Sequence, residues 1–278
     1  MERRAFLSTA AAGALSAAAA PSATIERKGR LKQSVCRWCY GKMPIEDLAR
    51  EAARLGLKSI DLIAPEEWPA IKKYGLIPTM VPGGTTIPDG FNRKENHAGI
   101  LQRLRAAIDL AAKEGAPSVI VFSGNRRGMS DEEGLENCYI GLRQIVKHAE
   151  DKGILICMEL LNSKVNHPDY MCDHTKWGVE LVKRVNSPNF KLLYDIYHMQ
   201  IMEGDVIRTI RDNFQYIGHF HTAGVPGRNE IDDTQELNYR AIAKAIVDLG
   251  FTGYFAHEFI PKRDPLKSLA EAVDLCDV

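Results

Sequence analysis

From residue 31 onward, the chain repeats one pattern: a short apolar run, a polar turn, and then a longer amphipathic stretch. Eight of the apolar runs have the length and composition of buried β-strands. They cover residues 33–36, 59–63, 77–81, 118–122, 155–159, 191–195, 216–221 and 254–258. Strands that alternate with helices predict a parallel sheet whose strands are joined by helical crossovers.

The amphipathic stretches carry helix start and stop signals. Segment 44–56 has Pro44 where a helix begins and Gly56 where it ends. In segment 130–153, Ser130 and Glu133 have the spacing of a capping box. Eight strand–helix units predict an α/β fold, a closed (β/α)8 TIM barrel that forms a single domain over residues 31–278.

The main alternative is an open, doubly wound sheet. That fold usually has a glycine-rich first turn, but the first turn here, "RWCYGKMP", contains no G-x-G-x-x-G. The three longest loops follow the third, fifth and seventh strands, which in a barrel places them on the catalytic face. No Pro/Gly/Ser-rich linker divides the chain.

Residues 1–30 differ from the rest of the chain. The stretch "MERRAFLSTAAAGALSAAAAPSA" has a basic start, an Ala-rich apolar centre and small residues at its end. This layout predicts a leader of the twin-arginine type, and therefore an exported, periplasmic protein if the leader is used and a cytoplasmic one otherwise. The alternative is an Ala-rich segment without a targeting role. The apolar run is too short for a stable membrane span.

Charge and cysteine content exclude several classes of protein. Acidic and basic residues number 36 each, so no basic surplus indicates a nucleic-acid partner. The 6 cysteines are too few for a disulfide scaffold. Cys36 and Cys39 form a C-x-x-C, but they lie at the first strand, so packing is favoured over a redox or zinc role.

The last four strands share an unusual feature: each turns polar at its C-terminal end. Taken singly, a carboxylate there commonly caps a helix and a histidine is commonly a core residue. In a barrel, however, the four ends converge, and clustered carboxylates without a cation would raise one another's pKa. The residues at these ends are Glu159, Asp195, His219, His221, His257 and Glu258.

A divalent cation bound by four of these side chains removes the repulsion. We predict Glu159, Asp195, His221 and Glu258 as its ligands. His257 is adjacent to Glu258 and faces the other way, so it is expected to pack, with a supporting role as the alternative. Three oxygen ligands and one imidazole favour Mg²⁺ or Mn²⁺, with Co²⁺ and Zn²⁺ as alternatives.

This ligand pattern resembles the xylose-isomerase-like TIM barrels, which include hydroxypyruvate isomerases and ketose 3-epimerases. The segments "YDIYHMQIMEGD" and "VPGRNE" are similar to those of hydroxypyruvate isomerases. The resemblance implies that Glu159 and Glu258 are both ligands and the catalytic acid–base pair. It also implies that His198 and Arg228 contact substrate oxygens.

Two positions depart from the family pattern. Hydroxypyruvate isomerases often carry Gln where this chain has His221, whereas the epimerases carry His. The epimerases carry another Glu six residues after the first ligand, where this chain has Val165. The pattern therefore mixes features of both branches.

Other side chains are candidates for substrate binding. The planar guanidinium of Arg228 can hold a carboxylate through two hydrogen bonds, although a solvated loop arginine is the alternative. Glu230 is a possible partner of Arg228. His198 either contacts substrate or orients Asp195, and Trp38 either lines the pocket or packs at its edge.

These observations leave three functions open. The first is a metal-dependent isomerase that interconverts hydroxypyruvate and tartronate semialdehyde through an ene-diolate. The second is a ketose 3-epimerase with the same site, and an inositol-type dehydratase is a further relative. The third is an exported sugar- or metal-binding protein without turnover. A small hydroxy-carbonyl substrate is expected, and a homo-oligomer is compatible with the sequence.

Overall fold

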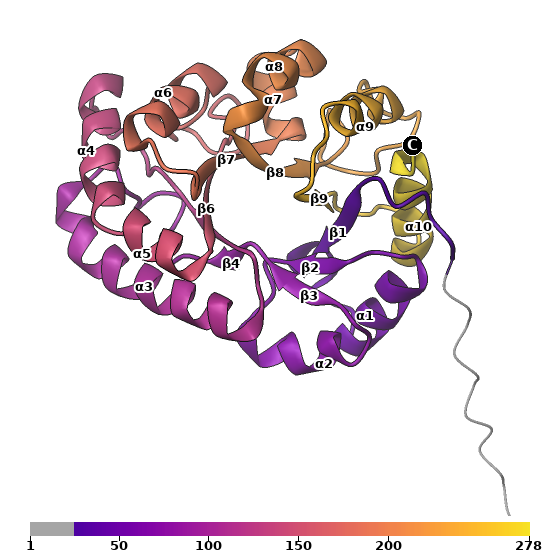
Figure 1. Ribbon diagram of the computed structural model, residues 1–278. Helices are drawn as coiled ribbons and strands as arrows, with labels where there is room; N and C mark the ends of the chain where they lie inside the picture. The colour runs from indigo at the N-terminus through magenta and orange to yellow at the C-terminus, as the bar shows by residue number, and fades with distance from the viewer. Residues whose placement is uncertain (1–24) are drawn as a thin grey trace, which may run out of the picture.

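The computed structural model describes residues 25–278, and these form one parallel sheet enclosed by helices (Figure 1). The strands lie in the order β3-β2-β1-β9-β8-β7-β6-β5-β4. Every pair of neighbouring strands is parallel. The strands are β1 (Lys32–Cys36), β2 (Ser59–Asp61), β3 (Ile77–Thr79), β4 (Val81–Pro82), β5 (Ser118–Val121), β6 (Leu155–Glu159), β7 (Phe190–Asp195), β8 (Ile217–Thr222) and β9 (Tyr254–His257).

The sheet has nine strands in this part of the chain because the third predicted strand is divided. Met80, between β3 and β4, has a left-handed backbone with a φ of 45°. β3 pairs with β2, whereas β4 pairs with β5. One bent segment thus joins both edges of the sheet, and the ring corresponds to the predicted eight-stranded barrel. At the bend, the Met80 N–H donates to Ser118 Oγ at 3.3 Å.

Helices occupy the outside of the barrel (Figure 1). Ser130 accepts a hydrogen bond from the Glu133 N–H at 3.2 Å, so α4 begins where the capping box predicts. The helices are α1 (Ile45–Arg54), α2 (Trp68–Lys72), α3 (His97–Glu114), α4 (Asp131–Arg143), α5 (Val146–Lys152), α6 (Thr175–Val185), α7 (Ile196–Met202), α8 (Val206–Asn213), α9 (Tyr239–Asp248) and α10 (Pro265–Cys276).

The barrel interior is filled directly beneath the polar strand ends. Side chains alternate along a strand, so Cys157 and Leu193 share a face with Glu159 and Asp195, two residues further along. Cys157 and Leu193 form a buried apolar cluster with Ile120 and Met80. This layer closes the barrel below the polar end and gives the carboxylates an apolar floor.

Residues 1–24 of the predicted leader lie outside the described residues, whereas residues 25–30 contact the barrel. The Ile25 N–H donates to the carbonyl of Arg54 at 2.8 Å. Arg30 Nε donates to the carbonyl of Val278 at 2.6 Å. Between residues 25 and 278, no helix has the length and apolarity needed to cross a bilayer.

Candidate metal centre

The structure brings the four predicted ligands together at the carboxyl ends of neighbouring strands. Glu159 ends β6, Asp195 ends β7, His221 lies in β8, and Glu258 directly follows β9. Asp195 and His221 are partners in the register of β7 and β8. All four side chains are buried, and each offers a ligand atom within 4.8 Å of the other three. The barrel register therefore assembles the cluster that the strand ends predict.

Spacing and hydrogen bonding both fit a divalent cation. His221 Nδ1 lies 3.3 Å from Glu159 Oε1 and 3.0 Å from Glu258 Oε2. Adjacent ligands of an ion bound at about 2.0–2.2 Å are separated by about 3 Å. Among residues 25–278, Glu159 Oε1 is buried without a hydrogen-bond partner, which is costly for a carboxylate oxygen unless a cation or substrate meets it.

Burial raises the pKa of the Asp195 carboxyl to about 8. Arg228 lowers it in part, and the charges of Glu258 and Glu159 add to the increase. Burial and the charge of Glu258 also raise the pKa of Glu159. The pKa of Glu258 is held low, because His221 and Arg228 outweigh its burial. Without a cation, burial therefore favours a proton on Asp195 near neutral pH.

Arg228 covers the solvent side of the carboxylates. Its Nη2 lies 2.6 Å from Glu258 Oε2 and 3.6 Å from Asp195 Oδ2. The guanidinium carbon is 5.2 Å from the centre of the Trp38 ring and 5.4 Å from that of Tyr197. The Arg228 guanidinium is thus within cation–π distance of two aromatic rings, an arrangement that favours a cation.

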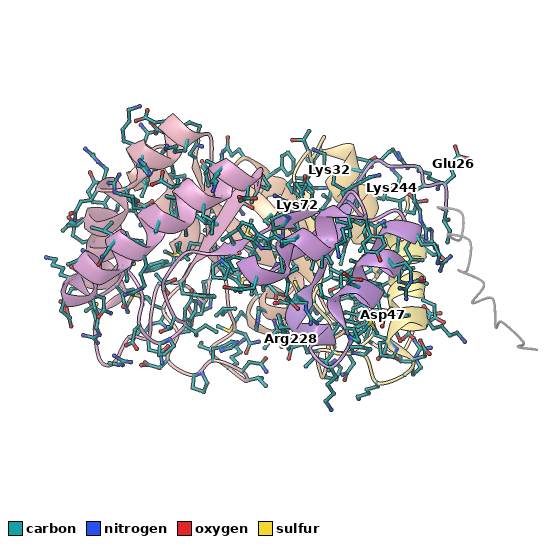
Figure 2. The ribbon with its side chains drawn as sticks, turned by 90° about the horizontal axis from the view of Figure 1, so that it is seen from below. Glu26, Lys32, Asp47, Lys72, Arg228 and Lys244 are labelled. Carbon is teal, nitrogen blue, oxygen red and sulfur yellow. The ribbon has the colours of Figure 1, made fainter. Side chains whose placement is uncertain are left out.

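Figure 2 shows that Arg228 lies at one end of the barrel and Lys32, at the start of β1, at the other. Arg228 follows β8, so its end of the barrel is the one where the carboxyl ends of the strands meet. This is the catalytic face of a (β/α)8 barrel.

Trp38 lies at the edge of the same cluster, in the 3-10 turn (Arg37–Tyr40) that follows β1. Its indole Nε1 donates to Glu258 Oε1 at 2.8 Å. The residue is nevertheless 43% exposed. The indole N–H of Trp38 therefore orients a predicted ligand while part of the residue is open to solvent.

His198 presents one ring nitrogen to the cluster. Its Nδ1 accepts hydrogen bonds from the backbone N–H and the side-chain amide of Asn162, at 3.2 and 2.6 Å. These contacts assign the ring proton to Nε2, which lies 3.6 Å from Asp195 Oδ2 and has no hydrogen-bond partner in the described part of the chain. Burial, followed by the charge of Arg228, lowers the pKa of His198, so the ring is a neutral donor.

Asp195 is oriented by the backbone of the following helix. The His198 N–H donates to Asp195 Oδ1 at 3.0 Å, which caps the start of α7. The capping role that a single strand-end carboxylate suggests is therefore present. It uses one oxygen and leaves Oδ2 facing the cluster.

The structure adds two residues that the sequence interpretation missed. Asp61, the last residue of β2, is fully buried, and its Oδ2 lies 3.4 Å from His221 Nε2. Asn162, three residues after Glu159, fixes the ring of His198. Like Asp195, Asp61 is a carboxylate within an apolar run of the sequence. The strands next to it do not end in acids or histidines, so the sequence alone did not mark it as part of a cluster.

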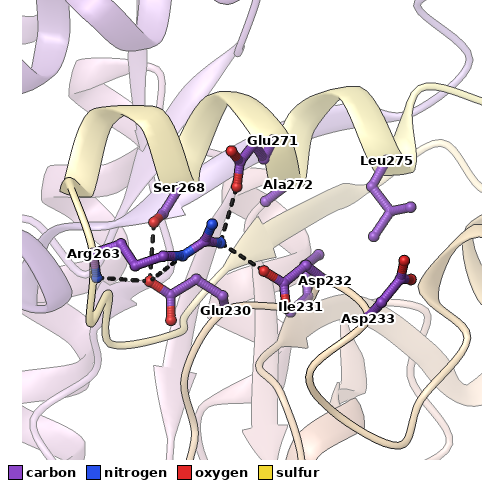
Figure 3. A pocket seen from close by; sticks show the side chains of 9 residues that line it. All are labelled: Glu230, Ile231, Asp232, Asp233, Arg263, Ser268, Glu271, Ala272 and Leu275. Atoms are coloured by element: carbon purple, nitrogen blue, oxygen red, sulfur yellow. Dashed lines mark hydrogen bonds and ion pairs between the residues drawn. The ribbon is translucent and has the colours of Figure 1, made fainter.

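Glu230 is not the partner of Arg228 that the sequence suggested. Its Oε1 accepts hydrogen bonds from the backbone N–H groups of Lys262 and Arg263, at 2.8 and 3.0 Å, and from Ser268 Oγ at 2.9 Å. Figure 3 shows this cluster, in which the Arg263 side chain also meets Asp232 and Glu271. Glu230 thus joins the loop after β8 to the loop after β9.

His257 and the cysteines have structural contacts. His257 is buried, with Nε2 2.9 Å from Gln33 Oε1 and Nδ1 3.1 Å from Thr222 Oγ1. Cys36 and Cys39 are both free thiols. Cys36 Sγ lies 3.8 Å from His221 Nε2, and burial raises the pKa of this thiol. These features fit packing better than redox chemistry.

The fold and the buried cluster define a class: (β/α)8 barrels with carboxylate and imidazole side chains at the carboxyl ends of their strands. The sequence model of the xylose isomerase-like TIM barrel family matches residues 40–277. The chain therefore belongs to this family.

Curated relatives carry isomerase names. The chain is 30% identical to the "Putative hydroxypyruvate isomerase" of Xenopus laevis, over 60% of this chain and 62% of that protein, which is less than two thirds of its length. It is 27% identical to the "2-oxo-tetronate isomerase" of Pectobacterium atrosepticum, over 80% of this chain and 89% of that protein.

Solved structures agree on the fold. The AP endonuclease, family 2, from Brucella melitensis superposes with a TM-score of 0.76 at 24% identity, covering 87% of this chain and 98% of that one. D-psicose 3-epimerase, crystallised in the presence of D-fructose, superposes with a TM-score of 0.69 at 19% identity, covering 89% and 94%. At these identities the likeness shows the fold alone.

Proposed function

We propose that this chain is a metal-dependent isomerase that moves a proton between adjacent carbons of a small α-hydroxy carbonyl compound, with hydroxypyruvate as the first substrate. The observation that carries the proposal is the pair Glu159 and Glu258, two buried carboxylates that both approach Nδ1 of His221 in one cluster. The names of the relatives above support an isomerase of this substrate class.

Glu159, Asp195, His221 and Glu258 would hold one divalent cation, Mg²⁺ or Mn²⁺ by their oxygen-rich chemistry, with Co²⁺ and Zn²⁺ as alternatives. When bound, the ion supplies positive charge that stabilises an ene-diolate. All other steps use the chain's own groups.

The two glutamates would share the acid–base work. Among residues 25–278, Glu159 Oε1 has no hydrogen-bond partner and is open to the cation or to substrate. Both oxygens of Glu258 are engaged, by Trp38 and by Arg228. One carboxylate of the pair would take a proton from C3 of hydroxypyruvate and the other would return a proton to C2, while the hydroxyl proton on O3 passes to O2, which gives tartronate semialdehyde.

His198, Arg228 and Trp38 would bind and orient the substrate. The His198 Nε2–H is buried, unpartnered and aimed at the cluster, which suits a hydrogen bond to a substrate hydroxyl or carbonyl oxygen. The Arg228 guanidinium can exchange its contact with Glu258 for a substrate carboxylate. The exposed part of Trp38 would line the entrance.

The test is turnover with proton exchange. Purified protein supplied with Mn²⁺ or Mg²⁺ should interconvert hydroxypyruvate and tartronate semialdehyde, and in D₂O it should incorporate deuterium at the reacting carbon. Glu159→Gln should abolish both signals. Glu180→Gln, the same change on the exposed side of α6, is the matched control. Turnover that survives in Glu159→Gln would contradict the mechanism.

A ketose 3-epimerase is the second candidate. His221 favours it, because the resemblance places a histidine at this position in the epimerase branch. Val165 opposes it, because this residue is 64% exposed and cannot supply the carboxylate expected there. A panel of free ketoses and 2-oxo acids assayed side by side separates the two, since only the 2-oxo acids offer Arg228 a carboxylate.

We also propose that residues 1–30 direct export, from the twin-arginine layout of their sequence. Fractionation of cells that express the full chain and an Arg3→Lys, Arg4→Lys variant tests this. Export of the wild type alone supports the proposal, and equal distribution of both contradicts it. If the exported protein binds carbohydrate tightly without exchanging protons with solvent, the non-catalytic binding function replaces the isomerase.

A further inference from the structure

We infer that Asp61 is a positioning residue that holds the imidazole of His221 so that its Nδ1 faces Glu159 and Glu258. The inference rests on the metal centre of the proposed function and assigns a role to a residue outside its four ligands.

The two nitrogens of His221 face different groups. Nδ1 lies 3.0 Å from Glu258 Oε2 and 3.3 Å from Glu159 Oε1. Nε2, on the opposite side of the ring, lies 3.4 Å from Asp61 Oδ2. An acceptor at Nε2 keeps a ring proton on that nitrogen, so Nδ1, which is hydrogen-bonded to Glu258 in the metal-free chain, is the nitrogen left to bind a metal. Carboxylates commonly orient metal-binding histidines in this way.

Asp61 is itself held from both neighbouring strands. Its Oδ1 accepts a hydrogen bond from Ser34 Oγ of β1 at 2.5 Å and another from Thr79 Oγ1 of β3. The side chain is fully buried. These two hydroxyls fix the plane of the carboxylate and direct Oδ2 toward the histidines. A buried carboxylate is costly, so its presence requires partners on this side as well.

Two other side chains approach the Asp61–His221 pair. Cys36 offers His221 a second acceptor, and His219 offers Asp61 a second donor. Cys36 Sγ also approaches His221 Nε2, but at 3.8 Å and with a weaker acceptor. His219 Nε2 lies 2.6 Å from Asp61 Oδ2, yet the two do not meet in hydrogen-bond geometry. Asp61 is therefore the strongest acceptor within reach of His221 Nε2.

Asp61, His219 and His221 also have the composition of a second metal site. The spacing argues against that assignment. Two ligands of one ion at about 2.0–2.1 Å are separated by about 3 Å, whereas Asp61 Oδ2 and His219 Nε2 are only 2.6 Å apart. We therefore assign this cluster to positioning, and the experiment below includes the second ion as an outcome.

The test is Mn²⁺ binding to the full chain, measured by calorimetry and by metal content. Asp61→Asn keeps the size and the Oδ1 acceptor but replaces Oδ2 with an amide that cannot accept from His221. We expect Mn²⁺ affinity to fall about 10- to 100-fold. In the metal-free protein, ¹⁵N NMR should show that the proton of His221 leaves Nε2 in this variant, a change that loss of stability alone does not cause.

Three further variants complete the design. Gln33→Met removes the partner of another buried histidine, His257, and should leave Mn²⁺ affinity unchanged. Ser34→Ala loosens Asp61 without removing it and should weaken binding less, which preserves the test if Asp61→Asn does not fold. Cys36→Ala should leave binding unchanged.

Wild-type affinity in Asp61→Asn, or equal weakening by Cys36→Ala, would overturn the inference. Two Mn²⁺ per wild-type chain, reduced to one in Asp61→Asn, would also overturn it in favour of a second metal site. Metal binding is independent of turnover. A weakened Asp61→Asn alongside a wild type that isomerises none of the substrates would reject the proposed function and leave the role of Asp61 standing.

Discussion

The two halves of the barrel share one architecture but differ in what their strands carry at the carboxyl end. Each of β6 to β9 has, in or next to its last two residues, an acid or an imidazole that reaches the candidate metal centre. Strand β1 ends in Cys36 and β5 in Val121, both buried and apolar in character. In the first half, only β2 ends in a carboxylate, Asp61, and it contacts His219 and His221 of β8 rather than the acids.

The difference shows that the residues that build the barrel are largely distinct from those that form the candidate metal centre. Both halves supply parallel strands and buried apolar side chains, so both contribute to folding. Among the residues that the structure describes, the four predicted ligands all come from the second half. Substitutions in the second half should therefore affect metal binding and turnover, whereas those in the first half should affect stability, with Asp61 and Trp38 as the exceptions.

The largest expected effect comes from removing a ligand in the second half. Asp195→Asn takes away one charge of the cation site while keeping the cap of α7. Turnover should fall on the order of 1,000-fold or more, because the charge stabilisation supplied by an ion is worth several kcal/mol and about 1.4 kcal/mol is tenfold in rate. Steady-state kinetics with bound-metal analysis measures both losses.

Asp212→Asn on the exposed face of α8 is the matched control for that experiment. Full metal content together with full activity in Asp195→Asn would remove Asp195 from the centre and abolish the contrast between the two halves.

The converse change lies in the first half. Ile60 of β2 is fully buried and, being adjacent to the inward-facing Asp61, faces the helices. Ile60→Ala should lower the free energy of unfolding by about 2–5 kcal/mol through lost burial and a cavity. Chemical denaturation measures this loss, and kcat measured where the variant is folded should remain that of the wild type. A large loss of kcat with unchanged stability would contradict the separation.

The pH dependence of stability adds a third test. The pKa of Asp195 is about 8 in the folded, metal-free chain, against an unfolded value of about 3.9. Between these values the folded state binds more protons, so this group makes the free energy of unfolding fall as pH rises. The difference between wild type and Asp195→Asn, followed by urea unfolding in EDTA from pH 5 to 8, isolates the contribution.

The direction in which the stability difference between wild type and Asp195→Asn changes with pH decides whether Asp195 retains a proton. Wild-type stability should decline relative to Asp195→Asn toward pH 8, and Mn²⁺ should bind more tightly at pH 8 than at pH 6, because binding displaces the retained proton. A wild type that gains stability relative to the variant as pH rises would show that Asp195 is ionised in the metal-free protein.

The comparison of halves also explains how far the sequence could be interpreted. All eight predicted strands are present, because each is a continuous apolar run whose character is local. The break at Met80 was not predicted, since it depends on β3 and β4 choosing different neighbours across the barrel. Four adjacent polar strand ends made the candidate metal centre predictable. Asp61 was missed because its partners lie across the barrel and its neighbouring strands end without an acid.

Loop contacts were the least predictable part. Glu230 and Arg228 are two residues apart, which suggested a pair, but a left-handed backbone at Arg228, with a φ of 59°, turns the two side chains apart. Arg228 points to Glu258, and Glu230 points to Lys262 and Arg263. Sequence spacing alone contains no information on this turn.

A smaller effect is expected from a substitution of Arg228. Arg228→Lys keeps the positive charge but loses the planar pair of donors, so KM for a 2-oxo acid should rise about tenfold, or about 1.4 kcal/mol. A substrate without a carboxylate should be affected less. Kinetics with hydroxypyruvate and with a neutral ketose provide the comparison, and an equal change for both would mean that Arg228 does not bind the carboxylate.

The smallest expected effect lies one step further out, at Glu230, where the loops after β8 and β9 are joined (Figure 3). Glu230→Gln keeps an acceptor for the two backbone N–H groups, so it should change KM less than Arg228→Lys does. Glu230→Ala leaves those donors without an acceptor and should cost about 1–3 kcal/mol of stability. Because Ile260 N–H also donates to the Arg228 carbonyl at 2.8 Å, the loops stay connected and kcat should be retained in both variants. If Glu230→Gln lowered kcat as much as Asp195→Asn does, the catalytic residues would not be confined to the strand ends. The distinction between the candidate metal centre and the loop residues that support it would then be wrong.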